Sequence, residues 1–343
     1  MNNKILVTGG AGYIGSHTVI ALIDAGYVPI IVDDFSNSDR SALKGLENIL
    51  KADVKHYEGD CNDEVFMRRV FENETDLLGV IHFAAYKAVA ESVAQPIKYY
   101  RNNIGSLLTV LKVMKEFNVE HFVFSSSCTV YGQPIKLPVT EQTPKQPAES
   151  PYGTTKLMCE QILEDHVGSG LPFKVVALRY FNPIGAHSSA EIGELPIGVP
   201  ANLIPFVTQT AAGLRDQLTV FGDDYDTKDG SCMRDYIHVM DLAQAHVKAL
   251  DYLDKQSTTS FYDVFNVGTG TGNTVFQVIH DFEEVSQVKL NYTIGPRREG
   301  DIEKIYANAD KSNNVLKWQA IRSLKDALRD SWAWQLNLKK KGI

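Results

Sequence analysis

The chain reads Thr8-Gly9-Gly10-Ala11-Gly12-Tyr13-Ile14-Gly15 directly after the apolar run Ile5-Leu6-Val7. Glycines recur at every third position, at Gly9, Gly12 and Gly15. A dinucleotide-binding loop needs glycine for a tight turn, for close approach of the backbone to a pyrophosphate, and for packing of a helix on a strand. The helix predicted from residue 14 to about residue 25 then directs its N-terminal N–H groups at the phosphates.

An acidic residue about twenty positions further on indicates which dinucleotide fits. Gly26 ends the predicted helix, and the apolar segment 28–32 that follows leads into Asp33. A carboxylate at this place accepts hydrogen bonds from the ribose hydroxyls and repels the extra phosphate of NADP. The alternative is a strand–helix turn that binds no ligand, and this acid makes that alternative the weaker one. We therefore expect NAD.

The composition places the chain among soluble globular proteins. Hydrophobic residues make up 44% and charged residues 22% of 343 residues, which is enough for a large core and two lobes. The net charge of −8 argues against a nucleic-acid partner or a membrane surface. We also find no signal peptide and no apolar run of membrane-spanning length, so we expect a cytoplasmic protein.

The four cysteines are Cys61, Cys128, Cys159 and Cys232. Their positions show no CxxC spacing and no neighbouring histidine pattern. We interpret them as reduced cytosolic thiols rather than a disulfide framework or a zinc site, and we expect no metal.

Strand and helix signals alternate through the first half of the chain. The candidate strands are 5–7, 28–32, 54–57, 80–83, 122–124 and 175–178, with long helical segments at 91–117 and 151–167. Short Val/Ile/Phe runs separated by helices indicate a doubly wound parallel sheet of the Rossmann type. After Asn182 the pattern becomes more scattered. We therefore expect an α/β protein with an NAD-binding domain at 1–182 and a smaller α/β substrate lobe at 183–343, with some chain crossing between them, and a site in the crevice between the two.

A second motif, Ser150-Pro151-Tyr152-Gly153-Thr154-Thr155-Lys156, lies at the start of a predicted helix. Ser150 suits the N-cap position and Pro151 the first turn. Tyr152 and Lys156 are four residues apart and are therefore neighbours on the helix surface. A lysine beside a tyrosine favours the phenolate, which makes the tyrosine a usable base. By itself this motif would describe an exposed Tyr–Lys pair; the glycine loop is what favours a catalytic pair.

A third motif, Phe124-Ser125-Ser126-Ser127-Cys128-Thr129-Val130-Tyr131-Gly132, lies where the fifth predicted strand ends. A hydroxyl at the carboxyl end of a strand faces the predicted site, which makes Ser127 a candidate. The alternative is a polar loop whose serines bond to backbone groups.

With these three motifs in this order, the chain resembles the extended short-chain dehydrogenase/reductase superfamily and, within it, the UDP-galactose 4-epimerases. The resemblance runs from Lys4 to at least Trp334. Further segments that carry it are Ala84-Ala85-Tyr86-Lys87-Ala88-Val89, Tyr99-Tyr100-Arg101-Asn102-Asn103, Leu178-Arg179-Tyr180-Phe181-Asn182-Pro183, Arg234-Asp235-Tyr236-Ile237-His238-Val239 and Arg297-Arg298-Glu299-Gly300-Asp301. It implies NAD-dependent, reversible 4-epimerisation of UDP-galactose and UDP-glucose in galactose metabolism.

The resemblance assigns binding roles to individual residues. For NAD it implies Gly9, Gly12, Tyr13, Ile14, Gly15, Asp33, Asn37, Ser38, Asp60, Cys61, Phe83, Ala84, Lys87, Asn102, Ser127, Tyr152, Lys156 and Phe181. For the UDP-hexose it implies Lys87, Ser127, Tyr152, Asn182, Asn202, Leu203, Phe221, Arg234, Arg298, Asp301 and Ile305. Cys61 stands where relatives usually carry an aliphatic residue, and we expect little effect because that contact is made mainly by backbone. The arginines suit phosphate because guanidinium forks bind its oxygens in pairs, although an isolated arginine more often forms a surface salt bridge.

The implied mechanism uses Tyr152, Lys156 and Ser127. Tyr152 takes the proton of the sugar 4-hydroxyl while the hydride on carbon 4 passes to NAD, and the 4-keto sugar rotates before the hydride returns to its other face. We expect Lys156 and the oxidised nicotinamide to lower the pKa of Tyr152 by about three units from its usual ~10.

Two rival functions remain to be weighed. A nucleotide-sugar 4,6-dehydratase would need an Asp-Glu pair where this chain has Cys128 and Thr129. A non-catalytic NAD sensor would be expected to lose the Tyr152–Lys156 pair, which is present.

The resemblance also bears on assembly and on the choice of hexose. It implies a homodimer formed by the helical segments 91–117 and 151–167 of two copies. It places Ile305, or after a one-residue slip Tyr306, opposite the sugar 2-substituent. Because isoleucine is smaller than tyrosine and bulkier than cysteine, we expect UDP-glucose and UDP-galactose as main substrates and weak turnover of UDP-N-acetylhexosamines; the alternative is that the N-acetylated sugars are main substrates.

Overall fold

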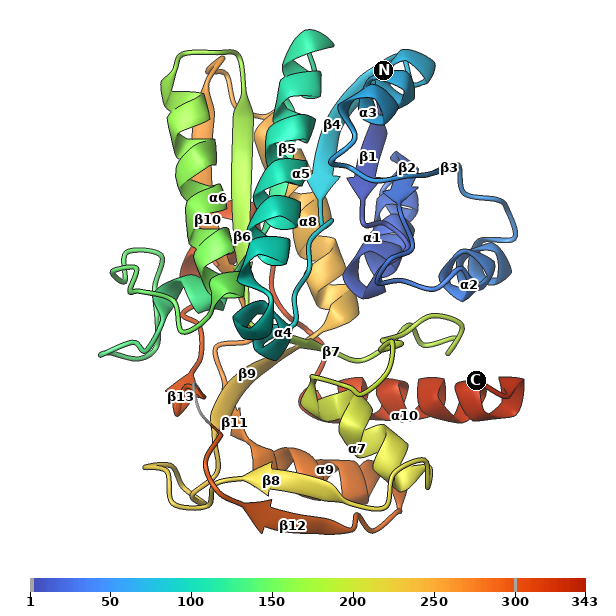
Figure 1. Ribbon diagram of the computed structural model, residues 1–343, viewed down its shortest axis with the longest axis vertical. Coiled ribbons are helices and arrows are strands. Elements are labelled where there is room, and N and C mark those ends of the chain that lie inside the picture. The colour runs from blue at the N-terminus through green and yellow to red at the C-terminus, as the bar shows by residue number, and fades with distance from the viewer. Residues whose placement is uncertain (1–2, 299–300) are drawn as a thin grey trace.

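A seven-stranded parallel sheet forms the centre of the larger lobe in the computed structural model, which describes residues 3–298 and 301–343 (Figure 1). The strand order is β10-β6-β5-β4-β1-β2-β3. The strands are β1 (Lys4–Thr8), β2 (Val28–Asp33), β3 (His56–Glu58), β4 (Leu77–His82), β5 (His121–Ser127), β6 (Lys174–Tyr180) and β10 (Phe261–Val267). The doubly wound parallel sheet predicted from the sequence is confirmed.

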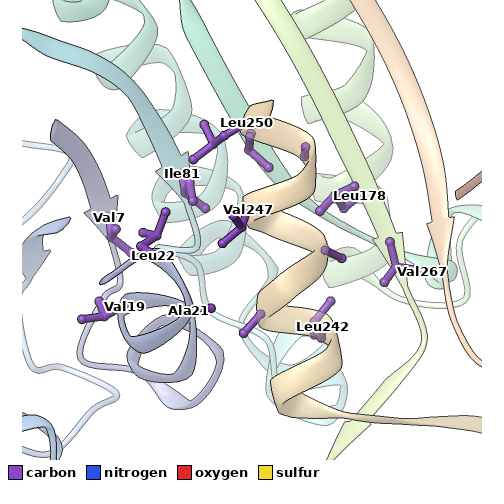
Figure 2. Packing of buried hydrophobic residues seen from close by; sticks show 14 of the residues in the cluster. Val7, Val19, Ala21, Leu22, Ile81, Leu178, Leu242, Val247, Leu250 and Val267 are labelled. Atoms are coloured by element: carbon purple, nitrogen blue, oxygen red, sulfur yellow. The ribbon is translucent and has the colours of Figure 1, made fainter. Parts of the chain in front are cut away.

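Alternate residues of the central strands face opposite layers of helices. In β1, Leu6 packs with helices α3 (Glu64–Asn73), α5 (Pro96–Glu116) and α6 (Pro151–Gly168), whereas Ile5 and Val7 pack with α1 (Tyr13–Asp24), α2 (Ser41–Leu50) and α8 (Val239–Asp254). Figure 2 shows the second layer, where Leu242, Val247 and Leu250 of α8 lie between α1 and the strands. Strands buried on both faces read as continuous apolar runs, which is why the sequence indicated them.

The seventh strand, β10, was not among the strands predicted from the sequence. It comes from the second half of the chain and pairs in parallel with β6. Its sequence FYDVFNV is only partly buried in its first four residues, because the strand lies at the edge of the sheet. An edge strand needs a weaker apolar pattern than a central one, so its signal is weak.

Several element boundaries differ from the prediction. The helical segment predicted at 91–117 is two helices, α4 (Val89–Ala94) and α5, separated at Gln95. Gln95 precedes Pro96 and takes a non-helical conformation, with φ −134° and ψ 59°, because the proline ring disfavours helical geometry in the residue before it. The strand predicted at 54–57 begins later, at His56, and the strand predicted at 80–83 is β4, which begins earlier, at Leu77, and ends at His82.

The smaller lobe packs three helices against short strands (Figure 1). One mixed sheet contains β7 (Asn182–Ile184), β9 (Met233–His238), β11 (Gly272–Thr274) and β13 (Lys304–Ile305), and a second pairs β8 (Leu218–Phe221) with β12 (Tyr292–Gly295). Its helices are α7 (Leu203–Ala211), α9 (Val275–Ser286) and α10 (Leu324–Lys341). Two single turns, Cys128–Tyr131 and Ser312–Leu316, complete the elements described. None of the described helices is both long enough and apolar enough to cross a membrane.

Candidate active site

The glycine loop after β1 leaves no room for side chains. Gly9 has a φ of +70°, and a Cβ on it would lie 2.9 Å from the backbone nitrogen of Ala84. A Cβ on Gly15 would lie 2.2 Å from the carbonyl oxygen of Gly9. Gly12 occupies the N-cap of α1 and brings no capping side chain. The loop therefore presents bare backbone and the start of a helix, which is the arrangement that a pyrophosphate requires.

Asp33 ends β2 and ties the glycine loop to the following loop. Its buried carboxylate accepts hydrogen bonds from the backbone N–H of Ala11 and of Phe35, each at 3.0 Å, and from the hydroxyl of Ser38 at 2.6 Å. Burial raises the pKa of Asp33, and these hydrogen bonds oppose that rise. The neighbouring Asn37 is exposed. The carboxylate is thus fixed at the sheet edge where the sequence predicts a ribose.

The predicted cofactor residues after β3 and on α5 are linked by a residue that the sequence analysis missed. The side-chain amide of Asn62 donates to Asp60 at 2.9 Å and to Asn102 at 3.2 Å. Cys61, between them in the chain, is buried among the apolar residues beneath α3 and α5. A polar residue two positions after Asp60 is the only signal that could have indicated this link.

Tyr152 is the second residue of α6, after Pro151, so it lies at the start of the helix as predicted. The Ser150 hydroxyl caps the helix by accepting from the backbone N–H of Gly153 at 3.3 Å. Burial raises the pKa of Tyr152 to about 12, and a hydrogen bond with Ser127 acts in the opposite direction. Ser127 is the last residue of β5, so the hydroxyl and the phenol meet at the carboxyl end of the sheet.

Lys156 lies one helical turn further and is held by Ser125. Its ammonium donates to the Ser125 carbonyl oxygen at 2.7 Å and to the Ser125 hydroxyl at 3.3 Å, and it lies 6.0 Å from the centre of the Tyr152 ring. Burial lowers the pKa of Lys156 to about 8. Burial is thus the largest influence of the protein's own groups on the pKa of Tyr152, and the lowering predicted for Lys156 together with the oxidised nicotinamide stays a prediction.

A buried ion pair joins helix α6 to the sheet. Both carboxylate oxygens of Glu160 bond the guanidinium of Arg179, at 2.8 and 2.7 Å, and one also accepts from the Ser126 hydroxyl at 2.5 Å. Glu160 and Arg179 are 0% and 3% exposed. The pair joins α6 to β5 and β6, the elements that carry the three predicted catalytic residues. Sequence analysis missed it, although Glu160 stands four residues after Lys156.

The substrate lobe brings together four of its predicted residues. The Arg298 guanidinium bonds the Asp301 carboxylate at 2.6 Å and lies 5.8 Å from the centre of the Phe221 ring. Arg234 lies 3.7 Å from the same carboxylate. Glu299 and Gly300, of the motif that contains Arg298, fall outside the described residues. Two guanidinium groups therefore converge beside an aromatic ring.

Ile305 lies opposite Arg234 in the β13–β9 ladder. It is 1% exposed and packs with Phe181 and Tyr131, whereas Tyr306 is partly exposed. Asn182, next to Phe181, begins β7 and pairs with Tyr236 of β9. Ile305, the predicted gate beside the sugar 2-substituent, thus contacts Phe181, which is predicted to contact NAD.

Lys87 and Asn202, which lie far apart in the chain, meet at Glu194. One carboxylate oxygen of Glu194 accepts from the Lys87 ammonium at 3.2 Å and from the Asn202 amide at 2.6 Å. Leu203 follows as the first residue of α7. Glu194 was not predicted from the sequence, because its segment has no regular pattern.

One group of side chains within the described residues has the spacing of a metal site. His280, Asp281 and Glu284 of α9 bring their ligand atoms within 4.8 Å of one another. Both oxygens of Glu284 are bonded by the Lys325 ammonium at 2.7 Å. We assign no metal to this group.

The chain was compared with known proteins. The family model described as GDP-mannose 4,6 dehydratase matches residues 6–331. The UDP-glucose 4-epimerase of Bacillus subtilis is 48% identical over 331 residues, which cover 96% of each chain. The chain belongs to the UDP-glucose 4-epimerase family.

Solved structures of UDP-glucose 4-epimerases superpose on the whole chain. The enzyme of Bifidobacterium longum in complex with NAD+ and UDP has a TM-score of 0.93 and 48% identity, with 97% of this chain and 98% of that chain covered. The enzyme of Stenotrophomonas maltophila with bound NAD and formylated UDP-arabinopyranose has a TM-score of 0.95 and 42% identity, with 98% and 99% covered. The resemblance predicted from the sequence motifs is confirmed, and so is the fold of a UDP-glucose 4-epimerase.

Proposed function

We propose that the protein is an NAD-dependent enzyme that interconverts UDP-galactose and UDP-glucose through a transient 4-keto sugar. The observation that supports this most directly is that Ser127, Tyr152 and Lys156 lie together at the carboxyl end of the sheet. The glycine loop lies at the same end, and its backbone has no room for side chains at Gly9 and Gly15. These groups suit removal of a proton from a sugar hydroxyl next to a bound dinucleotide.

The residues around the glycine loop fit NAD. The backbone of Gly9–Gly15 would hold the pyrophosphate, and the Asp33 carboxylate would accept hydrogen bonds from the ribose hydroxyls. The remaining cofactor residues predicted from the sequence extend this site from β3 to β7. NAD supplies, when bound, the acceptor for the hydride on carbon 4 and a positive charge beside Tyr152.

Tyr152 acts as the base and Ser127 orients the 4-hydroxyl towards it. Because burial raises the pKa of Tyr152 to about 12, the phenolate needs positive charge nearby. A unit charge at 6 Å in an effective dielectric of 20 contributes about 3 kcal/mol, or roughly two pKa units. Lys156 supplies one such charge at its distance of 6.0 Å from the Tyr152 ring. The bound cofactor supplies the second.

The smaller lobe binds the UDP portion and the hexose. Arg234 and Arg298 carry the charge that a diphosphate requires, and guanidinium forks match its oxygens in pairs. The Phe221 ring is 43% exposed beside Arg298, so it offers an apolar face to a base. Asn182, Asn202 and Leu203 complete the predicted substrate contacts.

A 4,6-dehydratase, which the description of the matching family model names, is the rival function. That reaction needs an acid–base pair at Cys128 and Thr129. Burial raises the pKa of the Cys128 thiol to about 12, and a threonine hydroxyl does not ionise at neutral pH, so neither can act as a general acid–base there. The chemistry of these two side chains favours epimerisation without elimination of water.

The preferred hexoses follow from Ile305. We propose UDP-glucose and UDP-galactose as main substrates and weak turnover of the UDP-N-acetylhexosamines, with the N-acetylated sugars as the alternative main substrates. A β-branched isoleucine that is 1% exposed is stiff and closely packed, so it would resist the extra acetamido group.

A homodimer is part of the proposal. Helices α5 and α6 pack side by side on one face of the sheet. They expose large apolar side chains, with Ile97 65%, Leu108 49% and Met158 44% exposed. A second copy of the same face would cover them in an isologous arrangement. Light scattering at micromolar concentration that gave the mass of one chain would rule the dimer out.

A cytoplasmic location, proposed from the free thiols of all four cysteines, belongs to the same proposal.

Purified protein mixed with UDP-galactose tests the function. Appearance of UDP-glucose supports the epimerase and excludes a non-catalytic sensor. Denaturation of the same preparation releases its nucleotide, and chromatography of the supernatant should find NAD. A released pool dominated by NADP would contradict the cofactor.

A further inference from the structure

Glu194 connects a residue of the larger lobe with a residue of the smaller one. Its carboxylate oxygen Oε1 accepts from the ammonium of Lys87, in the loop after β4, and from the side-chain amide of Asn202, directly before α7. The glutamate side chain is 12% exposed, whereas that of Lys87 is 48% exposed. The carboxylate is therefore the fixed member of the pair, and the lysine is directed by it.

The backbone of Glu194 is itself held in place by α10. The indole N–H of Trp334 donates to the carbonyl oxygen of Glu194 at 2.9 Å. The indole also packs on the preceding Gly193, where a Cβ would lie 2.5 Å from the ring. The carboxylate is thus presented from a rigid support rather than from a free loop.

Asn202 occupies the N-cap of α7 in an extended conformation, with φ −97° and ψ 151°. An asparagine at this position commonly accepts a hydrogen bond from the first turn of its helix. Here its side chain makes no capping hydrogen bond, and its amide donates to Glu194 instead. The orientation of Asn202 is therefore set by Glu194 and not by the helix that it precedes.

We infer that Glu194 is a positioning residue for the UDP portion of the substrate. By holding one polar side chain from each lobe, it sets the distance between two groups that the proposed function places on the ligand. This inference rests on the proposed function, because Asn202 is assigned to the substrate there and Lys87 is assigned to it by the family resemblance. Glu194 acts through these two side chains and takes no part in the proton or hydride transfer.

The chain provides a matched control three residues earlier. Glu191 also accepts from one amide and one lysine, Asn48 at 3.1 Å and Lys341 at 2.9 Å. Its partners have no place in the proposed site. Substitution of Glu191 therefore removes an equivalent pair of hydrogen bonds without touching the ligand contacts.

The test is calorimetric titration of the purified protein with UDP, together with initial rates on UDP-galactose. We expect Glu194→Ala to raise the UDP dissociation constant about tenfold, equivalent to about 1.4 kcal/mol, and to raise KM similarly while kcat changes less than about threefold. Glu194→Gln keeps an oxygen acceptor and should recover most of the affinity. Glu191→Ala should bind UDP as the unsubstituted protein does.

A double substitution distinguishes positioning from a merely structural role. If Glu194 acts through Asn202, then Glu194→Ala combined with Asn202→Ala should lose little more affinity than the larger of the two single changes. Fully additive losses would overturn the inference.

Other results would also overturn it. Tighter UDP binding by Glu194→Ala would mean that the carboxylate competes with the ligand for Lys87. An unchanged dissociation constant in a protein that still converts UDP-galactose would refute the role of Glu194 and leave the proposed function intact. If the unsubstituted protein neither bound UDP nor converted UDP-galactose, both the inference and the proposed function would be refuted.

Discussion

The ion pair between the large sheet and helix α6 is buried, whereas the ion pair of the smaller lobe lies near the surface. Glu160 and Arg179 are paired in the interior beneath Ser127 and α6, where neither is more than 3% exposed. The Arg298–Asp301 pair lies near the surface, with the arginine side chain 57% exposed. A buried pair cannot change partner without leaving a charge unpaired, whereas an exposed pair is worth little and can exchange its contacts for those of a ligand. The comparison indicates that the reacting groups are fixed by folding and that the recognition groups are free to rearrange.

The largest expected effect is the loss of turnover when the proposed base, Tyr152, is substituted. Tyr152→Phe removes one hydroxyl, and a general base typically contributes about 10²–10⁴-fold. We expect kcat for UDP-galactose to fall by that factor while the fold and the released NAD remain unchanged, as measured by circular dichroism and chromatography. Wild-type turnover by this variant would show that the sheet fixes a different base.

The buried pair should be much more costly to break than the exposed one. Glu160→Gln leaves Arg179 as an unpaired buried charge, so we expect the free energy of unfolding to fall by about 3–5 kcal/mol. Asp301→Asn should lower it by less than ~1 kcal/mol. Urea denaturation of both variants measures the two values. Equal losses would remove the contrast between the two regions.

Ile305 lies where the larger and the smaller lobe meet. Its substitution therefore tests whether this contact determines which UDP-hexose is turned over. A clash of this size discriminates by about 1–3 kcal/mol. Ile305→Ser should raise the ratio of UDP-N-acetylglucosamine to UDP-glucose turnover, and Ile305→Tyr should abolish activity on the N-acetylated sugar. An identical ratio in both variants would show that Ile305 is not the gate.

The smallest expected effect is a pH dependence of the free energy of unfolding, which we expect from His82 at the end of β4. His82 bonds the Thr8 hydroxyl at 2.8 Å, and burial lowers its pKa to about 3. The unfolded chain binds this proton more readily, so stability is lost as the pH falls from about 6.5 towards 3, by about 1.4 kcal/mol per pH unit. Denaturation at pH 7 and pH 5.5 should show a steeper loss in the wild type than in His82→Asn, which keeps a polar partner for Thr8. The same loss in both would place the titrating group elsewhere.

The elements of the larger lobe differ in how well the sequence predicted them. The strands of the large sheet were recognised because central parallel strands are buried on both faces and therefore read as apolar runs, as in β1 and β6. The edge strand β10 was missed because half of it meets solvent. The break before Pro96 was missed because the helical pattern continues across it, although proline restricts the residue that precedes it.

The sequence by itself determined the glycine loop, Asp33 and the order of Ser127, Tyr152 and Lys156, because turn geometry, helix capping and i,i+4 spacing are local properties. Only the tertiary structure decided which side chains hold these groups. Ser125 bonds Lys156, Arg179 bonds Glu160, and Glu194 bonds Lys87, and each of these contacts joins different elements or loops of the chain. The structure likewise decided the burial of Tyr152, which raises the pKa of its phenol, because burial depends on the packing of the whole protein and not on local spacing.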